Sequence, residues 1–183
     1  MSRFAPLNRD VVTMSRTHLG ARVATFAAGA TFVALLGASS DLDLWPAVAM
    51  LALVLLATWH PHTLMPLLAI AYLLVNWIAI APATWTGWVL PAAVSLVTFH
   101  TGAALCAAVP AQAPLTAPLW RLTGRRLAIV SAVTAMVWVA AAVIERAEFG
   151  TGILPGLVGL SVLGVALAAH YRVFARPADG SVR

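Results

Sequence analysis

The chain contains, from residue 44 to residue 120, the stretch LWPAVAMLALVLLATWHPHTLMPLLAIAYLLVNWIAIAPATWTGWVLPAAVSLVTFHTGAALCAAVPAQAPLTAPLW. These 77 residues lie between Asp43 and Arg121 and include no Asp, Glu, Lys or Arg. At ~1.5 Å per residue, one helix of this length would be far longer than the ~30 Å hydrocarbon core of a bilayer. We therefore expect the stretch to fold back and cross a membrane repeatedly.

The composition indicates the same class of protein. Hydrophobic residues make up 62% of the chain and charged residues only 9%, whereas soluble domains have about 45–50% and 25%. All eleven basic residues are Arg, and the net charge is +5. Because these charges lie between apolar segments, they are expected to set orientation in the membrane, and no nucleic-acid partner is expected. The single cysteine, Cys106, excludes an intramolecular disulfide and a cysteine metal cluster.

Charge-free apolar segments bounded by turn residues predict six membrane-spanning helices. They cover residues 23–38, 44–59, 64–81, 88–109, 127–144 and 152–171. Four prolines fall in the first turns of predicted helices, where the missing N–H costs little: Pro46, Pro66, Pro91 and Pro155. The predicted fold is an all-α bundle of about six transmembrane helices over residues 23–171. An N-terminal arm, residues 1–22, precedes it and a tail, residues 172–183, follows it.

The distribution of arginines predicts the orientation. With a cytoplasmic N-terminus, every arginine except Arg146 falls in a cytoplasmic segment, as the positive-inside rule requires. The alternative in which residues 44–81 form a re-entrant hairpin plus one helix would place Arg121, Arg125 and Arg126 on the wrong side. We therefore expect a multi-pass protein of the cell membrane with both termini in the cytoplasm.

One cytoplasmic segment, residues 110–126, combines three prolines with an aromatic and basic end. Trp120, Arg121, Arg125 and Arg126 are suited to contact anionic lipid headgroups or a partner protein at the membrane surface. The alternative interpretation is a connection that only fixes the topology. In the first predicted helix, Thr25 and Gly29 repeat the four-residue spacing of small residues that allows helices to approach closely.

Polar residues inside the predicted spans are the candidates for function, because burying them in a membrane is costly. The spans contain no Asp, Glu or Arg, which argues against proton or sodium coupling by carboxylates and against voltage sensing. The candidate intramembrane polar site consists of His100, Asn76, Thr98 and Ser161. His100 lies about 18 Å and Asn76 about 8 Å from the outer boundary, so a direct hydrogen bond is not expected without tilt. His100 is interpreted either as a neutral packing residue with a hydroxyl or carbonyl partner, or as a proton-relay or substrate residue.

No metal, cofactor or catalytic residue is predicted. His60 and His62 flank Pro61 in a tight turn, but zinc requires three or four ligands and no acid or cysteine is near in the sequence. The segment Gly159-Leu160-Ser161-Val162 resembles the Gly-x-Ser signature of rhomboid intramembrane proteases. The resemblance implies a dyad of Ser161 with His100, although the two residues occur in the reverse of the family's order.

Three functional hypotheses follow from these patterns. The first is an accessory or assembly subunit of a membrane complex, without catalytic activity, which binds another membrane protein and anionic lipid at the cytoplasmic face. The second is a small transporter or channel with a polar path near His100 and Asn76. The third, the most remote, is an intramembrane serine hydrolase using Ser161.

Overall fold

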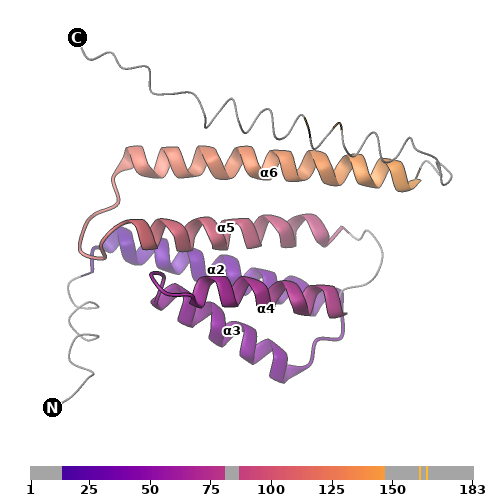
Figure 1. Ribbon diagram of the computed structural model, residues 1–183, viewed down its shortest axis with the longest axis horizontal. Helices are drawn as coiled ribbons and strands as arrows, with labels where there is room; N and C mark the ends of the chain where they lie inside the picture. Colours follow the sequence, from indigo (N-terminus) through magenta and orange to yellow (C-terminus); the bar gives the residue numbers. More distant parts are fainter. Residues whose placement is uncertain (1–13, 81–86, 147–160, 162–163, 165–183) are drawn as a thin grey trace, which may run out of the picture. The chain divides into compact units, whose positions relative to one another are not determined.

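The computed structural model describes residues 14–80 and 87–146, together with Ser161 and Gly164. Within these residues every regular element is helical (Figure 1). The helices, labelled as in Figure 1, are α2 Arg16–Ser39, α3 Leu44–Trp59, α4 Met65–Ile80, α5 Val89–Ala108 and α6 Ala117–Arg146. The all-α class expected from the sequence is thus confirmed for the described part of the chain.

Three of these helices are long and apolar enough to cross a membrane: α2, α5 and residues 117–143 of α6. Helices α3 and α4 have 16 residues each, or ~24 Å, which is shorter than a ~30 Å hydrocarbon core. The expected count of six helices is not supported, because the described residues contain five. The sixth expected helix, residues 152–171, lies outside the described residues except for Ser161 and Gly164.

The chain forms two units, residues 1–131 and residues 132–183. Helices α2 to α5 and the first half of α6 belong to the N-terminal unit, and the rest of α6 belongs to the C-terminal unit. Within the N-terminal unit, α2 is central because it packs along α5 on one side and against α3 on another (Figure 1). Helix α4 packs mainly on α3, to which it is joined by a short turn.

The contact between α2 and α5 depends on missing side chains. A Cβ built on Gly102 would overlap the hydroxyl of Thr25 and lie 3.1 Å from the Cβ of that threonine. A Cβ on Gly29 would lie 2.5 Å from Val54 and 3.1 Å from the ring of Phe99. The Thr25 and Gly29 spacing seen in the sequence therefore lies at the helix interface, where small residues let the backbones approach.

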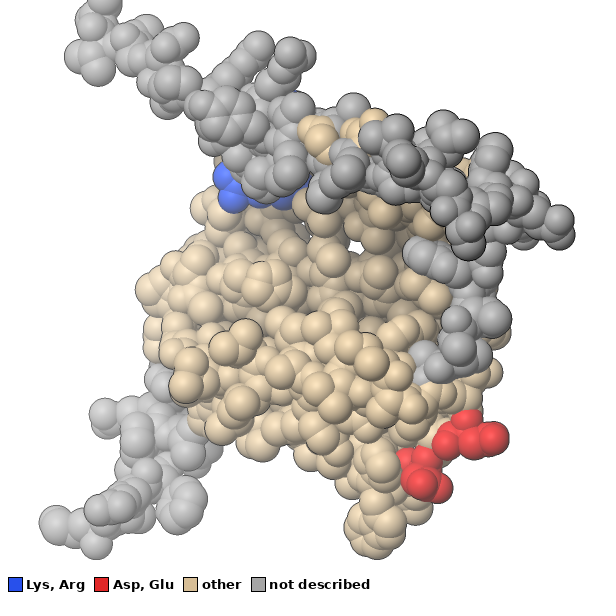
Figure 2. All heavy atoms as spheres, turned by 45° about the vertical axis from the view of Figure 1, so that its right-hand side comes forward, with Lys and Arg blue, Asp and Glu red and all other residues tan. Residues whose placement is uncertain are grey.

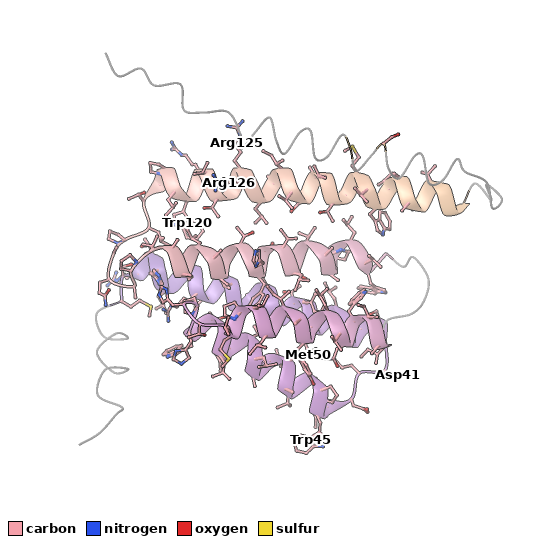
Figure 3. All side chains as sticks on the ribbon, viewed as in Figure 1. Asp41, Trp45, Met50, Trp120, Arg125 and Arg126 are labelled. Atoms are coloured by element: carbon pink, nitrogen blue, oxygen red, sulfur yellow. The ribbon has the colours of Figure 1, made fainter. Side chains whose placement is uncertain are left out.

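Large apolar side chains fill the remainder of the unit. Phe32, Leu36, Met50 and Phe99 are fully buried, and Figure 3 shows Met50 on α3 within the helical bundle. The ring of Phe32 lies 5.5 Å from that of Trp77 at 53°, a tilted geometry favoured by aromatic pairs. At the N-terminal end of α3, Trp45 is 81% exposed. A core of this kind holds α2 to α5 together without any ionic contact among its members.

The proline positions that were predicted to mark helix starts agree with the described helices. Pro46, Pro66 and Pro91 occupy the first turns of α3, α4 and α5, where no N–H is needed for a helical hydrogen bond. Pro155 lies outside the described residues. Pro118 occupies the first turn of α6 and belongs to the same series, although it was interpreted as part of a connection.

Two predicted boundaries were wrong by several residues. Helix α6 begins at Ala117, so residues 117–126 are helical rather than part of a surface connection. Leu and Arg, which supply half of these ten residues, are good helix formers, and their charge does not prevent a helix from extending beyond the hydrocarbon. Helix α2 begins at Arg16, inside the expected arm of residues 1–22, because the Ser15 hydroxyl caps it by accepting a hydrogen bond from the His18 N–H at 3.2 Å.

The glycine at the α2–α5 contact provides a test with a matched control. Gly102→Ala adds one methyl group where Thr25 already fills the space, so we expect a loss of about 1–3 kcal/mol in unfolding free energy. Gly124→Ala adds the same methyl group to α6 in open space, where better helix propensity should add about 0.5–1 kcal/mol. Unfolding titrations with a denaturing detergent in mixed micelles measure both changes. Equal effects at the two positions would contradict the proposed close contact.

Candidate functional site

The helices of the N-terminal unit share one end at which basic residues gather, here called the arginine end. It contains the start of α2, the end of α3, the end of α5 and the start of α6 (Figure 1). Its exposed arginines are Arg16, Arg121, Arg125 and Arg126. Asp41 and Asp43 lie at the opposite end, in the connection between α2 and α3. Figure 2 shows these carboxylates in red, arginines in blue on the other side of the view, and a charge-free surface between them.

Hydrogen bonds join the start of α2 to the connection between α5 and α6, and these contacts are here called the junction. The Ser15 N–H donates to the Ala111 carbonyl at 3.0 Å, and the Ser15 hydroxyl donates to the Ala113 carbonyl at 3.1 Å. The Leu115 N–H donates to the Thr17 hydroxyl oxygen at 2.9 Å. The junction thus satisfies polar groups of a non-helical segment and fixes the level of α2 relative to α5.

Two polar side chains of α2 are buried beside the junction. His18 is fully buried, and its Nε2 donates to the Val109 carbonyl at 3.2 Å, since a carbonyl oxygen can only accept. This bond leaves the buried Nδ1 without a partner among the described residues. Arg22 follows one turn later on the same helix face and is 9% exposed.

Arg22 is held by the end of α3 rather than by a carboxylate. Its Nη1 donates to the Trp59 carbonyl at 3.3 Å, and its guanidinium carbon lies 5.9 Å from the centre of the Trp59 ring. The carbonyls at a helix C-terminus carry partial negative charge, and an aromatic face attracts a cation. The Nε of Arg22 is buried and has no hydrogen-bond partner within the part of the chain that the structure describes. This arrangement connects α2 to α3 at the arginine end.

Among the predicted intramembrane residues of the N-terminal unit, Asn76, Thr98 and His100 form no hydrogen bond with one another. Asn76 donates to the Tyr72 carbonyl of its own helix at 2.8 Å, and Thr98 donates to the Val94 carbonyl of its own helix at 2.7 Å. His100 is exposed on α5 and has no hydrogen-bond partner in residues 14–80 and 87–146. Ser161 is helical and exposed, and it belongs to the C-terminal unit whereas His100 belongs to the N-terminal unit. The Ser161–His100 dyad therefore stays a prediction.

His100 lies in a groove of about 200 Å³, here called the His100 groove. Its lining comes from three segments: Pro61 and Thr63 from the α3–α4 turn, Pro66, Leu67 and Ile70 from α4, and His100, Ala103 and Ala104 from α5. Asn76 does not line it. The groove runs from the turn that contains His60 and His62, at the arginine end, to the middle of α5. His100 is the only titratable side chain among its described lining residues.

A second cavity of about 80 Å³ lies in the N-terminal unit beside the close contact of α2 and α5. Thr25, Thr98 and Gly102 line it together with Trp120, the aromatic member of the predicted lipid or partner contact. Figure 3 shows Arg125 projecting from α6 on the side away from Trp120. Arg121 and Arg126 are also exposed. Trp120 thus lines this cavity while remaining 40% exposed, and Arg125 leaves the helix on another side.

Reasoning from the sequence missed His18 and Arg22, because both were included in the N-terminal arm. The signal was present: Ser15 is a favourable N-cap residue, and His18 and Arg22 are spaced four apart behind it. Cys106, which is buried and free, was already excluded from a disulfide. No group of three or more His, Cys, Asp or Glu side chains suited to a metal ion occurs among the described residues.

Comparisons of the chain with models of protein families, with curated proteins and with solved structures find no match. The function is therefore argued from the residues of this chain alone. Four features of the described residues bear on the function: the buried cation at the end of α3, the groove beside His100, the charge separation along the N-terminal unit, and helix α6, none of whose residues from 117 to 143 is buried.

The junction predicts that replacing Thr17 destabilises the fold more than replacing a threonine outside the junction. Thr17→Val removes the oxygen that accepts from the Leu115 N–H, a backbone group of a buried residue, and should lower the unfolding free energy by about 1–3 kcal/mol. Thr31→Val is the control, because the exposed Thr31 hydroxyl donates only to the Ala27 carbonyl of its own helix; its effect should stay within about 0.5 kcal/mol. The same detergent titration measures both. If Thr17→Val changed the unfolding free energy as little as Thr31→Val, the junction would not contribute to the stability of the fold.

Proposed function

We propose that this chain is a multi-pass protein of the cell membrane and an accessory or assembly subunit of a membrane complex, with no catalytic activity of its own. The observation that carries the proposal is the exposure of α6. None of its residues from 117 to 143 is buried, whereas a helix inside a bundle normally buries a stripe of its surface. The half-buried residues Leu119, Thr123 and Leu127 follow one side of the helix. The apolar residues exposed elsewhere on α6, among them Leu122, Val139 and Val143, offer a long contact surface for another membrane protein.

The packing of α2 to α5 also favours a structural role. The buried hydroxyls of Thr25, Thr58 and Ser95 each donate to a carbonyl of their own helix. A transport path needs polar groups that face one another or line a water-filled space across the bilayer. Among the described helices, each of these hydroxyl groups is satisfied by a backbone carbonyl of its own helix. These groups therefore do not form such a series.

The proposed orientation has the arginine end in the cytoplasm and both termini on that side. It is supported by the exposed Arg121, Arg125 and Arg126 at one end and by Asp41 and Asp43 at the other. In this orientation the arginines meet the anionic headgroups of the cytoplasmic leaflet, each contributing about 1 kcal/mol of attraction. A cytoplasmic C-terminus requires one further membrane crossing, over residues 152–171.

One observation favours the second candidate, a small transporter. His100 is a titratable side chain that lines a groove of about 200 Å³. In that case His100→Ala would abolish flux in liposomes while expression and folding are retained. Asn76 contributes less to this alternative than the sequence suggested, because its amide donates to its own helix and does not line the groove.

The orientation can be tested with single cysteines in a Cys106→Ala background. We expect Asp41→Cys to react with a membrane-impermeant maleimide in intact cells, because Asp41 is exposed at the end assigned to the outside. Gln112→Cys, exposed at the arginine end, should react only after the membrane is permeabilised. Labelling is measured by a gel shift. The reverse pattern would place the N-terminus outside and refute the proposed topology.

The accessory role predicts a stoichiometric partner. The tagged full-length protein, extracted in native lipid discs, should copurify with one other membrane protein at a fixed molar ratio, measured by quantitative mass spectrometry. The isolated protein in liposomes should show neither flux nor turnover. A protein that purifies alone and supports flux that His100→Ala abolishes would establish the transporter instead.

A further inference from the structure

His100 is the one exposed ionisable side chain in the middle of an apolar helix among the described residues of the N-terminal unit. It lies eight residues from the end of α5 and eleven from its start, or about 12 Å and 16 Å along the helix. If α5 crosses a bilayer, the imidazole lies at the level of the acyl chains. Lipid chains carry no hydrogen-bonding group at that depth.

An unpaired imidazole at this level is energetically unfavourable. Intramembrane polar residues face the protein interior or a cavity and have hydrogen-bond partners there. Asn76 and Thr98 each donate a hydrogen bond to a backbone carbonyl of their own helix. His100 has no such partner among the residues that the structure describes, and it faces the His100 groove. A hydrogen-bonding group that the described residues do not supply can come from a side chain that occupies the groove.

The walls of the groove suit a helix rather than a lipid headgroup. Ala104, which is exposed, presents only a methyl group beside His100, and the buried Ala103 forms the floor next to it, so another backbone can approach closely. On the other wall Leu67 is 64% exposed and ready to pack against an apolar helix. Proline and threonine of the α3–α4 turn close the groove at the arginine end.

The charges nearest the groove indicate the chemistry of the partner side chain. His100 lines the groove, and His60 and His62 lie in the turn beside it. The guanidinium group of Arg22, which belongs to α2, lies next to the end of α3 just before this turn. The acids of the described N-terminal unit, Asp41 and Asp43, are at the opposite end. The described ionisable groups on and beside the groove are thus imidazoles and a guanidinium, with no acid among them, and a carboxyl group would complement them.

We propose that the His100 groove receives a transmembrane helix of a partner protein, and that an Asp or Glu side chain of this helix hydrogen-bonds to His100. The inference rests on the proposed accessory function and adds to α6 a second contact surface, the His100 groove, for a partner helix. The imidazole and the carboxyl group share one hydrogen bond, so each satisfies the other in the hydrocarbon. Neither group is then left unpaired in the membrane.

The test uses a photoreactive benzophenone side chain on α4 of the full-length protein. Placed at Leu67, which lines the groove, it should crosslink in cells to the same protein that copurifies stoichiometrically with the wild type. Placed at the neighbouring Leu68, which is 51% exposed but outside the groove lining, it should not. Mass spectrometry of the crosslinked peptide should locate it on a transmembrane segment that contains an Asp or Glu.

Substitutions at His100 then distinguish hydrogen bonding from shape. His100→Leu should reduce the recovery of the partner and the Leu67 crosslink by about 3- to 20-fold, the range expected for one interhelical hydrogen bond. His100→Gln, which keeps a hydrogen-bonding amide, should retain most of both. Asn76→Leu is the matched control, since the Asn76 amide is satisfied by its own helix. Detergent unfolding of each variant verifies that the fold is retained.

The outcomes separate the two proposals. A wild-type protein that has no stoichiometric partner overturns the accessory function itself. A partner that is retained equally by His100→Leu, or that crosslinks from Leu68 and not from Leu67, leaves the accessory function standing and overturns the assignment of the groove. A Leu67 crosslink to a second copy of this chain, or to a segment without an acid, also overturns it.

Discussion

Helix α2 lies against α5 at a distance that only a residue without a side chain permits, and the rest of the N-terminal unit depends on this contact. Gly102 leaves the space that the Thr25 hydroxyl and methyl groups occupy, and Gly29 does the same for Val54 of α3. In a membrane, apolar burial supplies little force between helices, so close van der Waals contact has to hold them together. Because α2 is the helix shared by both contacts, it determines where α3 and α5 are placed.

The level of each helix along this contact is set at the arginine end. The junction aligns the start of α2 with the α5–α6 connection, and Arg22 aligns α2 with the end of α3 through the Trp59 carbonyl. A guanidinium group with no carboxylate near it among the described residues is stabilised here by the partial charges of a helix end and by an aromatic face. The same alignment places the α3–α4 turn beside His100 and so forms the groove.

Much of this arrangement was predictable where a single pattern operates over a long segment. The helix over residues 44–59 was predicted with both of its ends, because apolar residues run continuously between Asp43 and the His60 turn. Residues 117–126 were misjudged because arginines were interpreted as a connection, although Pro118 marked a helix start as Pro46 and Pro91 did. A charged helix can continue beyond the hydrocarbon, so charge marks the membrane boundary and not the end of the helix. Arg22 was misjudged for a related reason, since it was assigned to the N-terminal arm of residues 1–22 although α2 begins at Arg16.

The sequence by itself determined the all-α class of the described residues and the presence of apolar segments able to cross a membrane, because these properties follow from residue composition and spacing along one segment. Of the six crossings that it predicted, three are described as helices long and apolar enough for a membrane. It also located the small residues that pack and the polar residues that demand explanation. Only the tertiary structure decided that Asn76 is satisfied within its own helix while His100 faces a groove, and that His18 and Arg22 are buried. Whether a polar group is satisfied depends on which atoms of other segments lie within about 3 Å, and that information exists only once the helices are packed.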